Sequence, residues 1–162
     1  MQNEYKFQEN DPVFLLELAH YEYIELELLI SNEQVDMSKI DPVGDLYNGI
    51  PVISPLAKLL RYNYAVHKIS KDFDLKEIQK EPTNLIVNRR SDGKVYFVEI
   101  NLYSALLLEK IHEEKKKTGE EILKEMAIIL KKTNDQSIVE GGRTIFKKLL
   151  DAEVIIGTTK IK

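Results

Sequence analysis

The stretch Leu85 to Ile100, LIVNRRSDGKVYFVEI, decides the fold. Two runs rich in β-branched and aromatic residues flank a short polar segment, and Asp92-Gly93 within that segment is a strong signal of a β-hairpin. We expect a primed turn here, because glycine accepts a positive φ and aspartate tolerates one. The stretch therefore predicts an antiparallel pair of strands.

Three helices are predicted after this hairpin. Asn101 can cap the first, while Thr118 to Glu121 and Ser137 to Glu140 have the spacing of a capping box for the second and third. Gly141-Gly142 within the third predicts close helix packing rather than a phosphate-binding loop. A short apolar strand over 154–156 follows, and this element order is that of a winged-helix-like domain whose strands form one small sheet.

The residues before the hairpin predict a strand, a loop and a long helix. Apolar residues alternate with polar ones over 58–69, which indicates a strand with one buried face and places His67 on its polar side. Residues 31–57 are dense in Pro, Gly, Asn and Asp and read as a loop or linker. A helix over 12–30 is predicted, with Asp11 as its N-cap.

The predicted helix over 12–30 has more apolar residues than one face can bury. Its polar positions do not collect on one side, so we expect it to take part in self-association or in docking of a partner. Phe14 and Tyr21 are the predicted contact residues, and a homodimer through this helix is one expected form.

Together these elements predict an α+β fold, in which a long N-terminal helix and a strand lead into the winged-helix-like domain. We expect residues 1–57 to form the N-terminal helix and loop, and residues 58–162 to form the strand and the recognition domain. Residues 83–162 are expected to form a compact unit.

Length and composition set the class of protein. The chain has 162 residues, of which 43% are hydrophobic and 31% charged, as in ordinary globular proteins. The absence of cysteine excludes disulfides, thiol nucleophiles and cysteine-ligated metals. No signal peptide and no run of about 18 apolar residues is present, so we expect a cytoplasmic protein.

Motifs of catalysis are missing from the sequence. It has no GxSxG, SxxK, GxxxxGK[ST] or GxGxxG, and its histidines, His20, His67 and His112, are scattered. We expect a structural or surface role for His20 and an exposed position for His112. The sequence predicts no catalytic residue, no metal ligand and no cofactor, and hence a protein that is not an enzyme.

Four segments together resemble a known family: FLLELAHYEYIELELL, LLRYNYAVHKI, LIVNRRSDGKVYFVEIN and LYSALLLEKI. Over roughly 12–157 the chain resembles the C-terminal part of HvfC-like proteins. These bacterial proteins were long described as DNA-binding and are now regarded as partner subunits of multinuclear non-heme iron oxidases that modify ribosomally made peptides. The family commonly has proline where Ala65 stands here, and its members usually carry an additional N-terminal helical domain.

The resemblance implies a recognition or adaptor protein that binds a precursor peptide, the iron oxidase, or both. We expect the peptide to lie along a sheet edge beside the third helix, and the predicted contact residues are Val95, Phe97, Val98, Arg143, Ile145, Phe146 and Lys147. The alternative is a winged-helix DNA-binding regulator that uses Arg143, Lys147 and Lys148. Residues 81–162 hold 15 basic and 13 acidic side chains, far from the strongly basic surface of a dedicated DNA binder.

Overall fold

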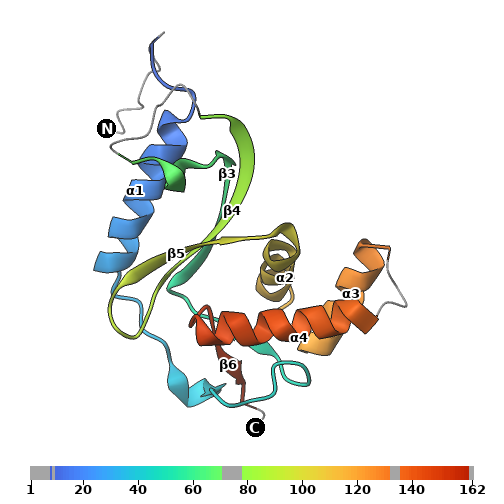
Figure 1. The fold of residues 1–162 in the computed structure, drawn as a ribbon. Helices are drawn as coiled ribbons and strands as arrows, with labels where there is room; N and C mark the ends of the chain where they lie inside the picture. Colours follow the sequence, from blue (N-terminus) through green and yellow to red (C-terminus); the bar gives the residue numbers. More distant parts are fainter. Residues whose placement is uncertain (1–7, 9, 71–77, 132–135, 161–162) are drawn as a thin grey trace.

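The fold is α+β, as predicted, with four α-helices and two three-stranded antiparallel sheets among the residues that the structure describes (Figure 1). The structure is a computed structural model and describes residues 8, 10–70, 78–131 and 136–160. The elements are α1 (Leu15–Ile30), η1 (Met37–Lys39), β1 (Ile40–Asp41), β2 (Pro51–Ile53), β3 (Ala57–Tyr64), η2 (Val66–Lys68), β4 (Lys80–Arg89), β5 (Val95–Ile100), α2 (Leu102–Glu113), α3 (Gly119–Ile129), α4 (Gln136–Asp151) and β6 (Ile155–Thr159).

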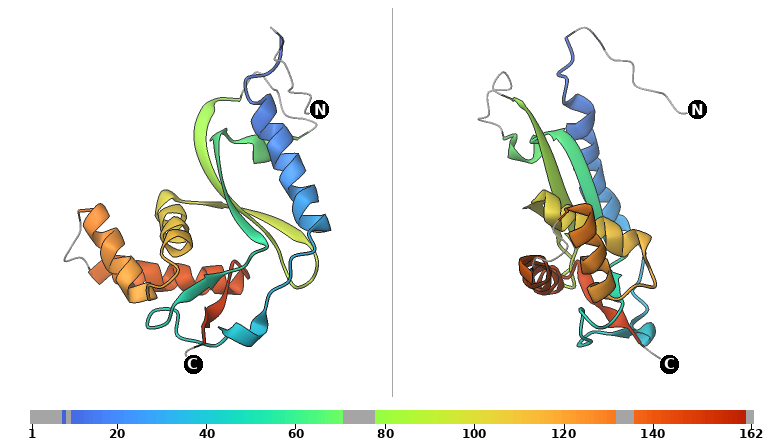
Figure 2. Two further views of the ribbon diagram at one scale, coloured as in Figure 1. Left: turned by 180° about the vertical axis from the view of Figure 1, so that it is seen from behind. Right: turned by 90° about the vertical axis from the view of Figure 1, so that its right-hand side faces the viewer.

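The larger sheet, in the order β3-β4-β5, separates two hydrophobic cores. Successive side chains of a strand point to opposite faces, so Leu85 and Val87 pack on the side of α1 while Ile86 packs on the side of α2, α3 and α4. The ribbon views place α1 against the strands, well away from α4 (Figure 2). Both faces of this sheet are therefore partly covered, and β3 and β5 are its edge strands.

The β4–β5 hairpin is confirmed, but its turn is not a primed one. The Gly93 N–H donates to the Arg90 carbonyl at 2.9 Å, and the Arg90 N–H donates to the Lys94 carbonyl at 3.0 Å. Gly93 has a φ of +79°, whereas Asp92 is not among the non-glycine residues with positive φ. This is the three-residue form, a type I turn followed by a glycine bulge. Asp92 therefore keeps a negative φ. Its carboxylate accepts a hydrogen bond from the Lys94 N–H.

Replacing Gly93 by valine is expected to lower the free energy of unfolding by about 1–3 kcal/mol, because a β-branched residue is strained at this φ. A Cβ at this position would meet no atom within 4 Å, so the cost comes from the backbone alone. Gly93→Asn is the matched control, since asparagine tolerates the left-handed region. Urea denaturation measures both variants, and equal stability of the two would contradict this turn.

The second sheet, in the order β1-β6-β2, corrects two predictions. The segment 31–57 is not simply a linker, because its turn formers connect η1 and two short strands. Asp45 shows how, since its carboxylate accepts from the backbone N–H groups of Tyr47 and Asn48 and folds the chain back. The last strand pairs with β1 and β2 rather than joining the hairpin, so the strands form two sheets and not one.

Caps begin the first two helices of the predicted domain. The Asn101 side chain accepts from the Ser104 N–H at the start of α2, and Thr118 and Glu121 form a reciprocal capping box at the start of α3. Both predictions are confirmed. Helix α4 begins at Gln136, so Ser137 lies within its first turn and not before it as predicted.

Two elements near the N-terminus differ from their predicted bounds. Helix α1 begins at Leu15, after Phe14, and Asp11 lies in a bend before it, so the predicted start at residue 12 is wrong. Strand β3 ends at Tyr64, and His67 belongs to the short helix η2 instead of a strand. The His67 Nε2 lies 3.0 Å from a carboxylate oxygen of Glu99 on β5.

Charged side chains attach α1 to the sheet at both ends. The Glu17 carboxylate accepts from the backbone N–H groups of Asn63 and Tyr64 at 2.9–3.0 Å. At the other end, the Arg89 guanidinium donates to three carbonyl oxygens at 2.8–2.9 Å, those of Leu28, Leu29 and Ser31. At the end of a helix such carbonyl groups receive no hydrogen bond from a helical N–H. A cation beside them also complements the helix dipole.

Among the helices that the structure describes, none is both long and apolar enough to cross a membrane.

Candidate peptide-binding edge

Strand β5 is an edge strand, since it pairs with β4 and no described residue bonds to its other side. From the turn onward, hydrogen-bonded residue pairs of β4 and β5 alternate with non-hydrogen-bonded ones. The Arg90 N–H bonds to the Lys94 carbonyl, so the next pair along, Arg89 and Val95, is a non-hydrogen-bonded one. The Arg89 N–H accordingly points the other way and donates to the Leu56 carbonyl. This alternation identifies which groups of β5 face outward.

The backbone groups of Val95, Phe97 and Glu99 point to the open edge of β5. The side chains of Val95 and Phe97 are half-buried and pack against the core beneath α1, and the Phe97 ring centroid is 4.3 Å from that of Tyr21. Two of the predicted contact residues are therefore at the edge through their backbone and not through their side chains.

A cavity of about 330 Å³ lies beside this edge, between β5 and α4. Val98, which is 40% exposed, lines it together with Ile145 and Lys148 of α4. The structure thus places Val98 and Ile145, two of the predicted contact residues, at one cavity. The walls are mostly apolar, and Lys148 and Glu99 both belong to the lining, so the cavity suits an apolar side chain.

The other predicted residues of α4 lie elsewhere. Arg143, Phe146 and Lys147 line a shallower hollow of about 250 Å³, next to Tyr47. The Arg143 guanidinium carbon is 3.9 Å from the centroid of the Tyr47 ring, a cation–π contact, and Phe146 is buried in the core. The structure does not bring these three residues to the cavity beside β5.

Phe14 and Tyr21 lie on the face of α1 that packs against the sheet. Phe14 is buried and meets Tyr64 edge to face, with ring centroids 6.3 Å apart. Burial, together with Glu22 and Glu25, raises the pKa of the Tyr21 hydroxyl. Both residues thus pack within their own domain, and the apolar surface that α1 leaves exposed belongs to other residues.

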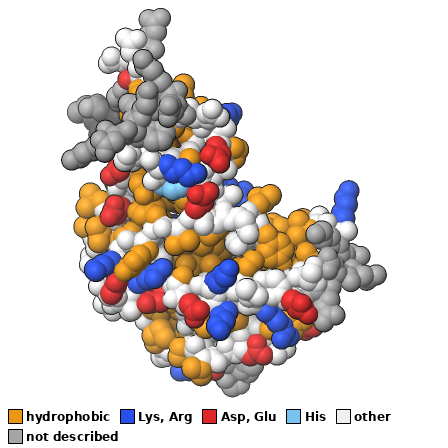
Figure 3. All heavy atoms as spheres, in the orientation of Figure 1, with side chains coloured by type: hydrophobic (Ala, Val, Ile, Leu, Met, Phe, Trp, Pro, Cys, Tyr) orange, Lys and Arg blue, Asp and Glu red, His pale blue; other side chains and the backbone are white. Residues whose placement is uncertain are grey.

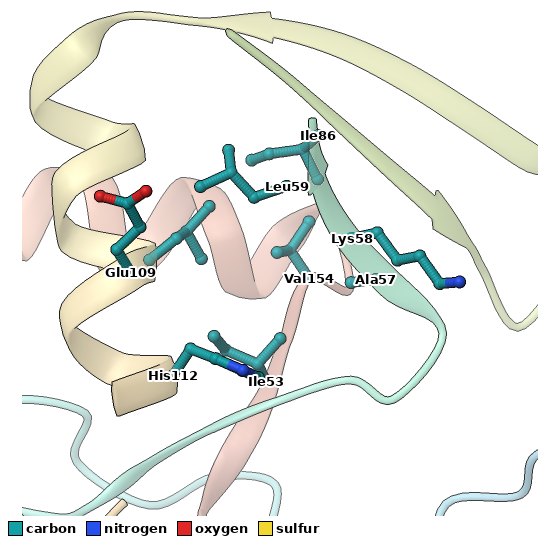
Figure 4. A pocket seen from close by; sticks show the side chains of 9 residues that line it. Ile53, Ala57, Lys58, Leu59, Ile86, Glu109, His112 and Val154 are labelled. Carbon is teal, nitrogen blue, oxygen red and sulfur yellow. The ribbon is translucent and has the colours of Figure 1, made fainter. Parts of the chain in front are cut away.

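A second cavity, of about 370 Å³, lies between β3 and α2 and was not predicted (Figure 4). Leu59 and Ile86 line it from the sheet, and Glu109 and His112 from α2, where His112 lies beside Ile53. Its walls come from segments far apart in the sequence, so no local pattern could have indicated it.

The outer edge of β3 is blocked at Asn63 and Tyr64, because the Glu17 carboxylate accepts from their backbone N–H groups. This leaves β5 as the more accessible edge of the sheet.

His20 and Tyr62 are in contact between two elements of the fold. The His20 Nδ1 lies 2.8 Å from the Tyr62 hydroxyl, in a contact between α1 and β3. Burial, with a smaller contribution from Glu17, raises the pKa of Tyr62 to about 12. No three His, Asp or Glu side chains within the described ranges are placed to hold a metal ion.

Comparison with known proteins gives a family match. Residues 54–150 match a family model described as HvfC C-terminal domain. The match includes β3, β4, β5, α2, α3 and most of α4, and it leaves α1 outside. A search of curated proteins finds no match.

Proposed function

The chain belongs to the HvfC C-terminal domain family, and from this premise we propose that it is a non-catalytic recognition protein that binds a precursor peptide and the iron oxidase modifying it. Membership supports a role as a partner or adaptor. The resemblance adds the chemical identity of the partners, a ribosomally made peptide and a multinuclear non-heme iron oxidase.

The open edge of β5 beside an apolar cavity is the observation that carries this proposal. An extended peptide can add to the edge as a further strand, through the outward backbone groups of Val95, Phe97 and Glu99. Every peptide offers these backbone bonds, so they give affinity without much sequence preference. Selectivity would come from a side chain that enters the cavity between Val98 and Ile145.

A DNA-binding regulator is the second candidate, because three cations, Arg143, Lys147 and Lys148, are exposed along α4. Phosphate contacts would make the affinity fall steeply with salt, whereas strand addition and apolar docking would not. Arg143 and Lys147 line a different hollow from Ile145, whereas Lys148 lines the cavity beside β5. They can therefore be separated by substitution.

Replacing Ile145 by glutamate is expected to weaken peptide binding at least tenfold, because the cavity would receive a charge where an apolar side chain has to pack. The double variant Arg143→Glu/Lys147→Glu alters the other hollow and is expected to keep peptide affinity within about twofold. Val98→Glu tests the same cavity from the strand, in case the half-buried Ile145 variant does not fold. Circular dichroism checks the fold of each variant.

The probe is the peptide recovered with the tagged protein from its native host, and it is titrated beside a short random-sequence DNA duplex at about 50 and about 200 mM salt. We expect peptide binding that changes little with salt and depends on Ile145. Tight duplex binding that is lost at the higher salt and in the double variant, without peptide binding, would contradict the proposed function. Recovery of the oxidase would support the second half of the proposal.

A further inference from the structure

Helix α1 presents an apolar stripe to solvent. Leu16, Tyr23, Leu26 and Ile30 are 52%, 60%, 53% and 67% exposed, and Ala19 lies among them. Their separations of three, four, three and four residues are those of the a and d positions of a coiled-coil heptad. We call residues 16, 19, 23, 26 and 30 the α1 stripe. Hydrophobic and acidic side chains lie together on the side where Figure 1 places α1 (Figure 3).

The opposite face of α1 is already used by the protein itself. Ile24 and Leu28 are buried against the sheet, and on the 3.6-residue repeat they stand half a turn away from the α1 stripe. Glu17 and Arg89 tie both ends of the helix to the strands. The stripe is thus displayed on a helix whose position is set, and a partner would not have to order it first.

The charge of α1 selects the kind of partner. The helix carries four glutamates and no lysine or arginine. On the heptad, Glu22 and Glu27 flank the α1 stripe on either side, and Glu27 lies 2.5 Å from Lys58 in an ion pair at the sheet. A second copy docked in parallel register would set these glutamates against each other, which is unfavourable. A helix with lysine or arginine beside its apolar seam would find a complementary charge at Glu22, while Glu27 already pairs with Lys58.

We propose that the α1 stripe is a docking surface for an amphipathic helix of a partner protein, one whose apolar seam is bordered by basic residues. The heptad spacing calls for a helical occupant, because knobs-into-holes packing needs the same repeat on both sides. The acidic border calls for a basic one. This surface goes beyond the proposed peptide-binding function. It lies outside the matched residues 54–150, on the far side of the sheet from the cavity beside β5.

The test uses two synthetic peptides of four heptads with leucine at a and d. One has lysine at e and g, and the other has glutamate there. Like charges at these positions keep each peptide from pairing with itself. We expect the lysine peptide to bind the full-length protein, with an affinity that falls as salt rises, and the glutamate peptide to bind at least tenfold more weakly. Fluorescence anisotropy measures both, and light scattering gives the oligomeric state of the protein.

Protein variants show whether the stripe is the site. Tyr23→Ser/Leu26→Ser removes two exposed side chains of the α1 stripe and is expected to weaken binding of the lysine peptide at least tenfold. Leu102→Ser/Ile128→Ser removes two exposed apolar side chains elsewhere, 70% and 63% exposed, and is expected to leave that binding unchanged. No binding of the lysine peptide, equal binding of both peptides, or equal loss in both variants would overturn the proposal. A dimer that dissociates only in the stripe variant would assign the surface to a second copy and would overturn it as well.

Discussion

Replacing Arg89 by methionine is expected to lower the free energy of unfolding by about 3 kcal/mol, because three carbonyl oxygens at the end of α1 lose a charged donor at once. Methionine keeps much of the length and apolar contact of the arginine stem, so the loss reports on the guanidinium. Helix α1 would then be held less firmly against the sheet. The near-UV circular dichroism of the protein should therefore also weaken, because Tyr21 of α1 and Phe97 of β5 are in contact. Urea denaturation measures the stability.

Arg90→Met is the matched control for that experiment. Arg90 is the next residue along the chain, and its guanidinium carbon lies 4.1 Å from the centroid of the Tyr96 ring. It donates no hydrogen bond to the end of α1, so its replacement is expected to cost about 1 kcal/mol or less. Equal losses in the two variants would show that the carbonyl bonds of Arg89 do not hold the helix.

Alanine at Gly141 and at Gly142 is expected to change stability in opposite directions. A Cβ on Gly142 would lie 2.2 Å from the Cδ2 of Leu123, a fully buried residue of α3. Overpacking there should outweigh the gain in helix propensity, and we expect a net loss of about 2 kcal/mol. A Cβ on Gly141 would meet no atom within 4 Å, so Gly141→Ala should gain about 1 kcal/mol. Thermal unfolding of the two variants gives the sign directly.

The smaller side chain of Leu123→Ala provides an independent check, because it removes the atoms that a Cβ on Gly142 would meet. In that background Gly142→Ala should cost less than in the natural protein, since residues in contact are not additive. If Gly142→Ala stabilises the natural protein as Gly141→Ala does, α3 and α4 do not approach each other closely at this point.

Local signals explain which parts of the fold could be predicted. The turn at Asp92-Gly93 and the caps at Asn101 and Thr118 depend on neighbours within a few residues, and all three lie where the sequence indicates. Strands β1 and β2 contain two and three residues, too few for any periodicity. Their pairing partner follows about a hundred positions later, and no local pattern carries such a pairing.

The sequence could predict which elements form the candidate site, but not which side chains of each helix point toward it. The sequence predicts a peptide edge beside the third helix, and Val98 of β5 and Ile145 of α4 line one cavity. Arg143, only two residues from Ile145, points to a different hollow, because a helix turns about 200° over two residues. For α1 the surplus of apolar residues was evident, yet a helix that is apolar on both sides does not reveal which side, Tyr21 or Tyr23, faces inward.

The central position of β6 in its sheet has a consequence for synthesis on the ribosome. Strands β1 and β2 both pair with β6, and the strand order shows no bond between the two of them. At roughly 5–20 residues per second, translation of the hundred or so residues from β2 to β6 takes about 5–20 seconds. During that interval the nascent chain can form the β4–β5 hairpin and the helix caps. Strands β1 and β2 have no strand to pair with until β6 is synthesised, so chaperones or strands of neighbouring chains can bind them.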